Sequence, residues 1–398
     1  MNIPFSPPDI TQLEIDAVSD TLRSGWITTG PKTKRFEQEI SARCGTPRSV
    51  CLSSATAAME LTLRLLEIGP GDEVITSAYT YTASASVICH VGARPVLVDT
   101  APGSYHLDPD AVSRAVTSRT KAILPVDIAG IPCDYEQFIG IAQRRKGLFK
   151  AASPQQKALG RAAVIADAAH SFGSLRGGVP SGALADFSCF SFHAVKNLTT
   201  GEGGAVTWRA REEWDDAELY RQFQLLSLHG QSRDALAKNA PGAWEYDILL
   251  PGYKCNMTDV AASIGLAQLE RYPSILARRR QLIERYDRAF ANLDVELLPH
   301  FTDAYTSNGH LYPVRLTGRD EAARNRVIES LARDGVAANV HYKPLPLLTA
   351  YRKLGYDAAS FPNALALYKN EVTLPLFSAM TDDQQDYVID RFCIALRG

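Results

Sequence analysis

An aspartate and a lysine follow two strand-like segments within residues 167–206. Asp167 ends the apolar run 162–167, and Lys196 lies between the apolar run 187–192 and a glycine-rich turn. Ligands of open α/β sheets bind at the carboxyl ends of strands, so we expect both side chains at one sheet edge. A desolvated lysine can form a Schiff base with pyridoxal phosphate, and an aspartate can keep the pyridine nitrogen of that cofactor protonated. Alone, each residue is explained more simply, as a surface charge and a strand-end cap.

A phosphate site is predicted at the helix start SSATAAM (53–59). Small residues there allow backbone amides to approach an anion, Ser54 and Thr56 add hydroxyl groups, and the helix dipole favours negative charge. An ordinary N-cap would need only one of these residues. The aromatic residues of AYTYTA (78–83) could lie over a planar ring, although core packing explains them more simply when they are taken alone.

The pattern of the first 210 residues predicts a sheet that would position Asp167, Lys196 and the helix start at 53–59. Short runs rich in Val, Ile and Leu alternate with amphipathic helical stretches, which is typical of βα units and a mostly parallel sheet. A first helix is expected between the capping box of Thr11 and Glu14 and Gly25, with apolar positions that include Leu13 and Leu22. Strands are expected at 49–54, 72–77, 94–99, 121–126 and 162–167.

The pattern changes after Thr258. The expected order is long helices at 258–272 and 275–293, an apolar run at 310–316, a helix at 320–334, an apolar run at 336–342 and a last helix capped by Thr381 and Gln384. We therefore predict an α/β protein with a large domain at 1–257, in which helices flank a mostly parallel sheet, and a smaller α+β domain at 258–398 that begins with long connecting helices.

Two other segments are predicted to lie at the surface. The stretch 144–161 breaks the alternation with Gly, Ser-Pro and basic residues, so we interpret it as an inserted loop or short helix in contact with solvent. The run Arg278, Arg279 and Arg280 is predicted on the solvated face of its helix.

The composition excludes several classes of protein. The 398 residues include 42 Lys and Arg against 44 Asp and Glu, a net charge of −2 that offers no basic excess to nucleic acid. Seven cysteines without a C-x-x-C pair are typical of reduced thiols, which predicts a cytoplasmic protein without a disulfide framework or metal site. Neither a secretion leader nor an apolar run of about 18 residues is visible.

Taken together, these motifs resemble the DegT/StrS-type sugar-nucleotide aminotransferases, pyridoxal-phosphate enzymes with the fold type I of aspartate aminotransferase. The resemblance covers nearly the whole chain. It rests on SGWITTGP (24–31), SSATAAM (53–59), GDEVITSAYTY (71–81), GARPVLVD (92–99), TKAILPV (120–126), DAAHSFG (167–173), SFHAVKNLTTGEGG (191–204), LPGYKCNMTDVAASIGLAQLE (250–270), HLYPVRL (310–316), VHYKPLP (340–346) and LPLF (374–377). The spellings SFHAVKN and SSATAAM look most like the branch that aminates the C4 ketone of a UDP-linked pentose.

The resemblance implies a role for each matched residue. Lys196 would carry the cofactor as a Schiff base and shuttle the proton, Asp167 would hold the pyridine nitrogen, and His170 would lie beside O3′. Tyr81 would stack on the ring. Phosphate contacts are implied for Ser54, Ala55, Thr56 and Ser191, and, from a partner subunit, for Lys254 and Asn256. No metal is implied.

The sequence departs from the family pattern at three positions. In GYKCN (252–256), Lys254 replaces the usual Asn and Asn256 the usual Arg, which changes the chemistry of the contact from the partner subunit. Asp127 stands where a His is common.

The implied reaction moves an amino group from an amino acid, usually glutamate, to the ketone of a nucleotide-linked keto sugar, at C4 rather than C3. The product would be an amino sugar for a polysaccharide, glycan or glycosylated metabolite, and the enzyme a homodimer with shared active sites. Substrate contacts are expected from Trp26, Thr28, His229, His310, Tyr312, His341 and Lys343, with Trp244 in the same stretch as His229. Lys343 would meet a diphosphate as a point charge.

Three alternatives compete with this interpretation. Some relatives are sugar dehydratases, but they carry His at the position of Lys196. A cofactor-binding regulator or sensor is a second alternative, although no helix-turn-helix or basic extension supports it. A fold type I aminotransferase for amino acids would need a carboxylate-binding arginine in the small domain, where Arg315 is the strand-borne candidate.

Overall fold

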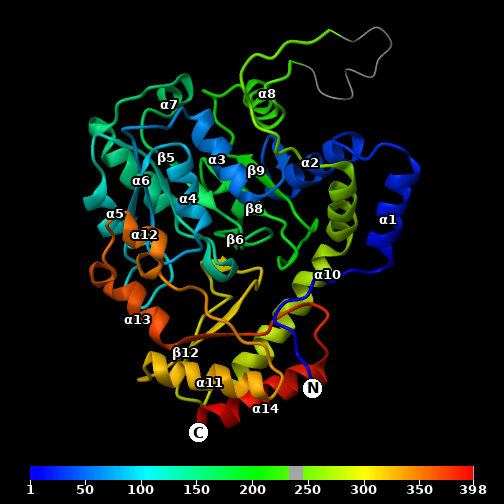
Figure 1. Ribbon diagram of the computed structural model, residues 1–398, viewed down its shortest axis with the longest axis vertical. Coiled ribbons are helices and arrows are strands. Elements are labelled where there is room, and N and C mark those ends of the chain that lie inside the picture. Colours follow the sequence, from blue (N-terminus) through cyan, green and yellow to red (C-terminus); the bar gives the residue numbers. More distant parts are fainter. Residues whose placement is uncertain (233–244, 398) are drawn as a thin grey trace.

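The computed structural model describes residues 1–232 and 245–397. In this part of the chain a seven-stranded sheet forms the centre of the large domain (Figure 1). Its strand order is β1 (Ser49–Leu52), β9 (Gly204–Trp208), β8 (Phe187–Ser191), β5 (Ala163–Asp167), β4 (Thr120–Leu124), β2 (Glu73–Ser77) and β3 (Arg94–Val98). β9 is antiparallel to both its neighbours, and the other neighbouring pairs are parallel. The predicted strands and the mostly parallel sheet are therefore confirmed.

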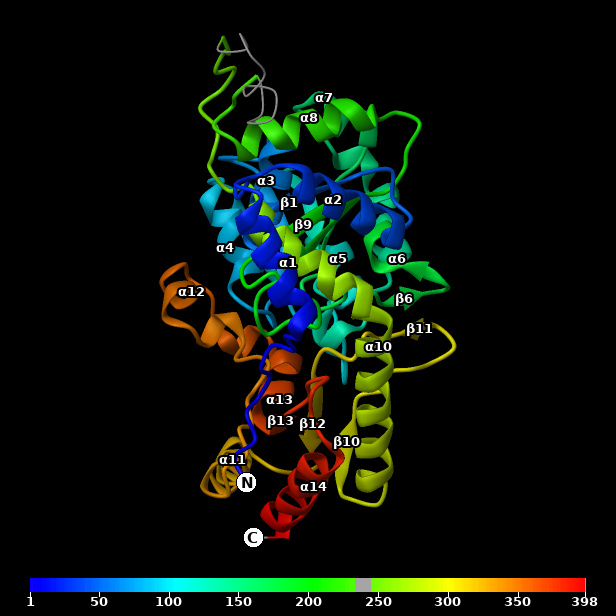
Figure 2. The same ribbon diagram turned by 90° about the vertical axis from the view of Figure 1, so that its right-hand side faces the viewer.

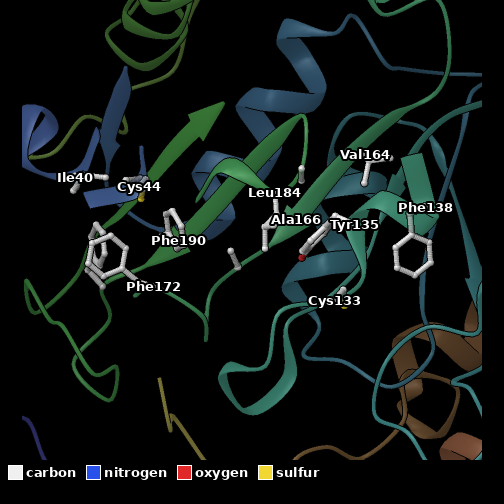
Figure 3. Close-up of a cluster of buried hydrophobic side chains, with 14 of the residues drawn as sticks. Ile40, Cys44, Cys133, Tyr135, Phe138, Val164, Ala166, Phe172, Leu184 and Phe190 are labelled. Carbon is white, nitrogen blue, oxygen red and sulfur yellow. The ribbon is translucent and has the colours of Figure 1, made fainter. Parts of the chain in front are cut away.

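Helices cover both faces of this sheet, which explains why its strands are apolar on both sides. The helices of the large domain are α2 (Pro31–Cys44), α3 (Ala55–Leu65), α4 (Ala83–His90), α5 (Pro109–Ala115), α6 (Tyr135–Arg144), α7 (Pro154–Leu159) and α8 (Asp216–Ser227). Consecutive strand residues point to opposite faces. Val164 packs in one apolar cluster with Phe190 (Figure 3), and Ile165 packs in another with Trp208.

The two long helices expected after Thr258 form one helix, α10 (Asp259–Phe290), with Pro273 inside it. Figure 2 shows α10 extending from the large sheet to the small domain. The helix α1 (Gln12–Arg23) packs against α10 and has the predicted capping box at Thr11.

The apolar positions predicted for α1 are only partly buried. Leu13 and Leu22 are exposed, whereas Thr21, which belongs to the predicted set, is buried together with Glu14. The reason is that Glu14 accepts a hydrogen bond from Gln268 on α10 at 2.8 Å, so a polar contact sets the face that docks.

The small domain contains a three-stranded antiparallel sheet of β10 (Val295–Leu297), β12 (Tyr312–Leu316) and β13 (Glu371–Leu374). Its helices are α11 (Glu321–Arg333), α12 (Thr349–Lys353), α13 (Pro362–Asn370) and α14 (Asp382–Arg397). The run 336–342 forms isolated bridges at Val336 and Asn339 instead of a strand. The capping pair Thr381 and Gln384 is confirmed, with hydrogen bonds of 3.0 and 3.2 Å.

A short third sheet joins the two domains. It consists of β6 (Leu175–Arg176), β7 (Val179–Pro180) and β11 (Tyr305–Thr306). Ile3 packs into the apolar cluster of the small domain, so the two ends of the chain lie near each other in Figure 1.

The domain boundary at 257/258 stays a prediction. None of the helices in the described ranges is both long and apolar enough to cross a membrane.

The structure confirms the first surface prediction and corrects part of the second. The stretch 144–161 is mostly exposed and contains the short helix α7, and it is anchored to the body because the buried side chains of Ser153 and Gln156 both donate to the carbonyl of Leu66. Within the arginine run, Arg279 is only 3% exposed. It donates to backbone carbonyls of the small domain, which helical periodicity alone could not reveal.

Candidate active site

A cavity of about 350 Å³ opens at the carboxyl ends of β5 and β8, beside the first turn of α3. The predicted residues that line it are Ser54, Ala55, Thr56, Tyr81, Asp167, His170, Ser191, Lys196 and His341. Tyr342, which belongs to the same predicted segment as His341, also lines it, and so do residues that sequence reasoning did not single out, among them Thr80, Val126, His193 and Glu202. The arrangement places both catalytic candidates in one cavity, as their positions after strands predict.

Asp167 lies at the end of β5 and is 4% exposed. Its Oδ2 accepts a hydrogen bond from the Ser84 hydroxyl at 2.6 Å, and its Oδ1 accepts one from the Ala169 amide at 3.2 Å. Burial raises the pKa of Asp167, while these hydrogen bonds and Lys196 oppose the shift. The carboxylate is therefore fixed in orientation and directed at the cavity.

Lys196 lies in the tight loop between β8 and β9. Its amide donates to the carbonyl of His193 at 2.8 Å, and Thr200 closes the loop onto Phe192 at 2.9 Å. Desolvation lowers the pKa of Lys196 to about 8, against the opposing effect of Asp167. At pH 7 about a tenth of the side chain is then the neutral amine, the form that attacks a carbonyl, and this fraction grows as the pH rises towards 8.

His170 lies in the turn after β5 and is 7% exposed. Burial first, and then Lys196 and His341, hold its pKa well below the usual range. Its Nε2 lies 3.1 Å from the hydroxyl of Tyr342. Its Nδ1 is buried and has no hydrogen-bond partner among the described residues.

The first turn of α3, where the sequence predicts an anion site, lines one end of the cavity. Ser54 is the N-cap, and its hydroxyl accepts from the Ala57 amide at 3.0 Å. The strand β9 passes very close: a Cβ on Gly204 would lie 2.5 Å from the backbone nitrogen of Ala55. Only glycine allows this approach, which shapes the end of the cavity beside α3.

The small domain closes the cavity with His341 and Tyr342. The amide of His341 donates to Oε2 of Glu371 at 2.9 Å, and its Nδ1 lies 2.9 Å from the hydroxyl of Thr373. The hydroxyl of Tyr79, in the large domain, donates to the carbonyl of His341 at 2.7 Å. Contacts to both domains thus fix this wall of the cavity.

Several predicted site residues lie outside the cavity lining. Tyr312 is buried in the small domain and donates to Asp287 at 2.7 Å. His310 is buried behind Lys196. Exposed or half-buried positions elsewhere are occupied by Trp26, Thr28, His229, Lys254, Asn256 and Lys343, and Trp244 lies outside the described residues.

Asp127, one of the three departures from the family pattern, is completely buried. It accepts hydrogen bonds from the amide of Cys133 at 2.8 Å and from the hydroxyls of Tyr135 and Ser171, each at 2.6 Å. Its own amide donates to the carbonyl of Asp167 at 3.1 Å. Asp127 therefore supports the turn that carries Asp167.

Known proteins share this fold and these motifs. The sequence profile of the DegT/DnrJ/EryC1/StrS aminotransferase family matches residues 8–393. The PMP form of the putative sugar aminotransferase Spr1654 from Streptococcus pneumoniae is 54% identical, with a TM-score of 0.97 over 100% of this chain and 99% of that one. Spr1654 has also been solved in its PLP form, which is 53% identical.

Two more distant relatives are named for biosynthetic roles. The spore coat polysaccharide biosynthesis protein SpsC of Bacillus subtilis is 38% identical over 400 residues, which cover 100% of this chain and 97% of SpsC. The structure of Helicobacter pylori PseC, an aminotransferase involved in the biosynthesis of pseudoaminic acid, is 25% identical with a TM-score of 0.87, covering 100% of both chains. Fold type, enzyme class and cofactor are thus confirmed. The chain belongs to the DegT/DnrJ/EryC1/StrS aminotransferase family and is a pyridoxal-phosphate-dependent sugar aminotransferase.

Proposed function

We propose that this enzyme transfers the amino group of L-glutamate to the C4 ketone of a nucleotide-linked keto sugar. The observation that carries the proposal is that Lys196, Asp167 and His170 converge on one cavity at the end of the sheet. The position of amination is supported by the spellings SSATAAM and SFHAVKN, which surround this cavity. The product would be an amino sugar for a polysaccharide, glycan or glycosylated metabolite, made in the cytoplasm.

The residues of the cavity fit pyridoxal phosphate. The buried Nδ1 of His170 lacks a partner among the described residues, so a polar group of a ligand can satisfy it. Asp167 offers a fixed carboxylate to the pyridine nitrogen, and the α3 N-terminus at Ala55 and Thr56 offers amides to the phosphate. Ser191 lines the same end, and the exposed ring of Tyr81 is available to cover the cofactor ring.

When bound, the cofactor supplies the electron sink for amino transfer. Lys196 would hold the cofactor covalently, and its amine, when free, would accept and return the proton that amino transfer must move. Asp167 keeps the pyridine nitrogen protonated. His170 holds the O3′ side of the ring.

The alternative substrate, a free amino acid as acceptor, is not supported by the position of Arg315. This arginine lies on β12, and its Nη1 pairs with Oε2 of Glu296 at 2.6 Å. It is absent from the described lining of the cavity. The arginine that a second carboxylate substrate needs is therefore occupied elsewhere.

The working unit in this proposal is a homodimer with shared active sites. Large apolar side chains are exposed on and around α1, namely Ile10, Leu13, Ile15, Leu22 and Ile27. Ile15 and Leu22 lie on the same face of α1, and exposed apolar side chains that share a helix face are typical of an interface between copies of a chain. Lys254 is exposed and donates to Asn256, which in turn donates to Thr29, so this cation is held at the surface where a partner subunit can use it.

The substrate is tested by giving the holoenzyme glutamate and a panel of nucleotide-linked 4-keto and 3-keto sugars, together with the same sugars without nucleotide. We expect 2-oxoglutarate release only with the nucleotide-linked 4-keto sugars, and NMR of the product should place nitrogen on C4. Amination at C3 would refute the proposed position of the new amino group. Equal turnover of the free sugars would refute the proposed need for a linked nucleotide.

The cofactor lysine is tested separately by reduction with borohydride. The unaltered protein should lose its visible absorbance and gain the cofactor mass on the peptide that contains Lys196. Lys196→Ala should show neither change, whereas Lys157→Ala, an exposed lysine on α7, should behave as the unaltered protein. A reducible imine in Lys196→Ala would contradict the assignment.

A further inference from the structure

His310 lies directly behind Lys196 and is fixed from two other sides. It is 4% exposed, and its ring centroid lies 4.3 Å from that of His170. Its carbonyl oxygen accepts a hydrogen bond from Nη2 of Arg279 at 2.8 Å. Its Nε2 lies 3.5 Å from Nζ of Lys196. The ring therefore faces the lysine with little freedom to turn away.

The amide of Asn197 determines which ring nitrogen of His310 carries the proton. Nδ2 of Asn197 donates to the carbonyl of Asn308 at 2.8 Å, and its Oδ1 lies 3.1 Å from Nδ1 of His310. A carboxamide oxygen only accepts hydrogen bonds, so Nδ1 must be the protonated nitrogen.

The charge of His310 follows from its surroundings. Burial first, and then His170, Lys196, Arg279 and His341, hold the pKa of His310 well below its usual range. The ring is therefore neutral. With the proton on Nδ1, Nε2 keeps a lone pair that faces the lysine.

We propose that His310 is a positioning residue for Lys196: the unprotonated Nε2 accepts a hydrogen bond from Nζ, and Asn197 fixes the tautomer that makes this possible. The inference rests on the proposed role of Lys196 and adds the group that orients it. It explains how the lysine is kept in place whenever it is free of the cofactor.

This arrangement keeps Lys196 from occupying the carboxylate that Asp167 offers to the pyridine nitrogen. A freed lysine is a flexible cation, and the carboxylate of Asp167 attracts it, as the upward contribution of Asp167 to the pKa of Lys196 shows. If Nζ paired with that carboxylate, Asp167 would no longer be available to the pyridine nitrogen. His310 is a neutral acceptor, and its backbone is held by the buried Arg279. It can therefore retain the lysine without adding a charge that competes with the carboxylate of Asp167.

The tautomer is tested by nitrogen NMR of the cofactor-free protein with labelled histidine. We expect the resonance of His310 to show a protonated Nδ1 and an unprotonated Nε2 at pH 7. Asn197→Leu should abolish this preference, and Asn197→Asp, which retains an acceptor, should preserve it. A protonated Nε2 in the unaltered protein would overturn the inference.

The contact itself is tested by the pH profile of Lys196 methylation in the cofactor-free protein, followed by peptide mass spectrometry. An ammonium group gains more from an acceptor than a neutral amine does, so His310→Leu should lower the apparent pKa of Nζ by about one unit. His310→Gln, which places an amide oxygen near the position of Nε2, should restore most of it.

The matched control is His300→Leu. His300 is 1% exposed, and its Nδ1 lies 3.1 Å from the hydroxyl of Ser307, so its loss perturbs the same segment without touching Lys196. Identical profiles for His300→Leu and His310→Leu would overturn the inference while the borohydride result still supports the proposed function. Absence of a reducible imine from the unaltered holoenzyme would overturn both.

Discussion

The hydroxyl of Ser84 and the carboxylate of Asp167 are joined by a 2.6 Å hydrogen bond between the first turn of α4 and the end of β5. The same hydroxyl lies 2.8 Å from that of Thr80, so it belongs to a short polar chain at the cavity wall. This contact orients the carboxylate before any ligand arrives. A charge that is oriented in advance stabilises a developing charge without reorganisation.

Asp167→Asn should bind the cofactor but lose about 100-fold or more in kcat, because a neutral amide cannot keep the pyridine nitrogen protonated. Ser84→Ala, which leaves the charge and removes its orientation, should lose much less. Cofactor content by absorbance and turnover with glutamate check both variants. Turnover of Asp167→Asn near that of the unaltered enzyme would show that Asp167 is only a strand cap.

Glu37, on α2 and away from the cavity, should make stability depend on pH. It is 5% exposed, and burial raises its pKa from 4.5 to about 7 although Cys51 and Tyr220 donate hydrogen bonds to it. The folded state binds this proton more tightly than the unfolded state, so the stabilisation is present below pH 4.5 and is lost as the pH rises through 7.

Glu37→Gln mimics the protonated carboxyl group. Compared with this variant, the unaltered protein should therefore lose on the order of 3 kcal/mol in free energy of unfolding between pH 4.5 and 8. Urea denaturation at several pH values measures the difference. A constant difference across this range would mean that Glu37 keeps an ordinary pKa.

Arg279→Lys should destabilise the protein by roughly 3 kcal/mol, because one ammonium group cannot replace the fork that reaches the carbonyls of Gly309, His310 and Leu376. The adjacent Arg280→Lys is the control. Arg280 is exposed and pairs with Glu284 at 2.8 Å, so its replacement should change the unfolding midpoint very little. Equal midpoints for the two variants would contradict the structural role of Arg279.

Lys343→Ala should raise KM for the sugar nucleotide by roughly tenfold and leave the glutamate half-reaction unchanged, because the amino donor has no diphosphate. Lys343 is exposed and follows the two residues of the small domain that line the cavity, His341 and Tyr342. Lys353→Ala, an exposed lysine at the end of α12, is the control. Equal losses in both half-reactions would place the sugar nucleotide elsewhere.

The parts of the site that local patterns could predict are those carried by single elements. Asp167 and Lys196 directly follow apolar runs, and Ser54 begins a helix, so their positions follow from strand and helix signals alone. Ser84 was missed, and the contact of Tyr342 with His170 was not foreseen, because each acts through a residue distant in sequence. The hydroxyl of Tyr342 reaches His170 only once the two domains are packed.

The same limit explains the errors in the fold. Two helices were expected on either side of Pro273 because proline removes a hydrogen-bond donor, yet packing against α1 and the small domain keeps α10 continuous. The arginine run matched a polar helix face, but the carbonyl oxygens that Arg279 satisfies lie in segments 30 to 97 residues away. Tertiary hydrogen bonding decided both cases.

Because α10 is continuous, it fixes the distance between the two segments that Tyr272 and Arg279 hold. Tyr272 donates to the carbonyl of Phe172 in the turn beside His170 at 2.6 Å, and Arg279 holds the carbonyl of His310. Seven residues of α-helix separate these anchors by roughly 10 Å along the axis. The two histidine-bearing segments that meet near Lys196 are therefore spaced by one rigid rod, and Pro273, which lacks a backbone donor, is the position between the two anchors where this helix bends most easily.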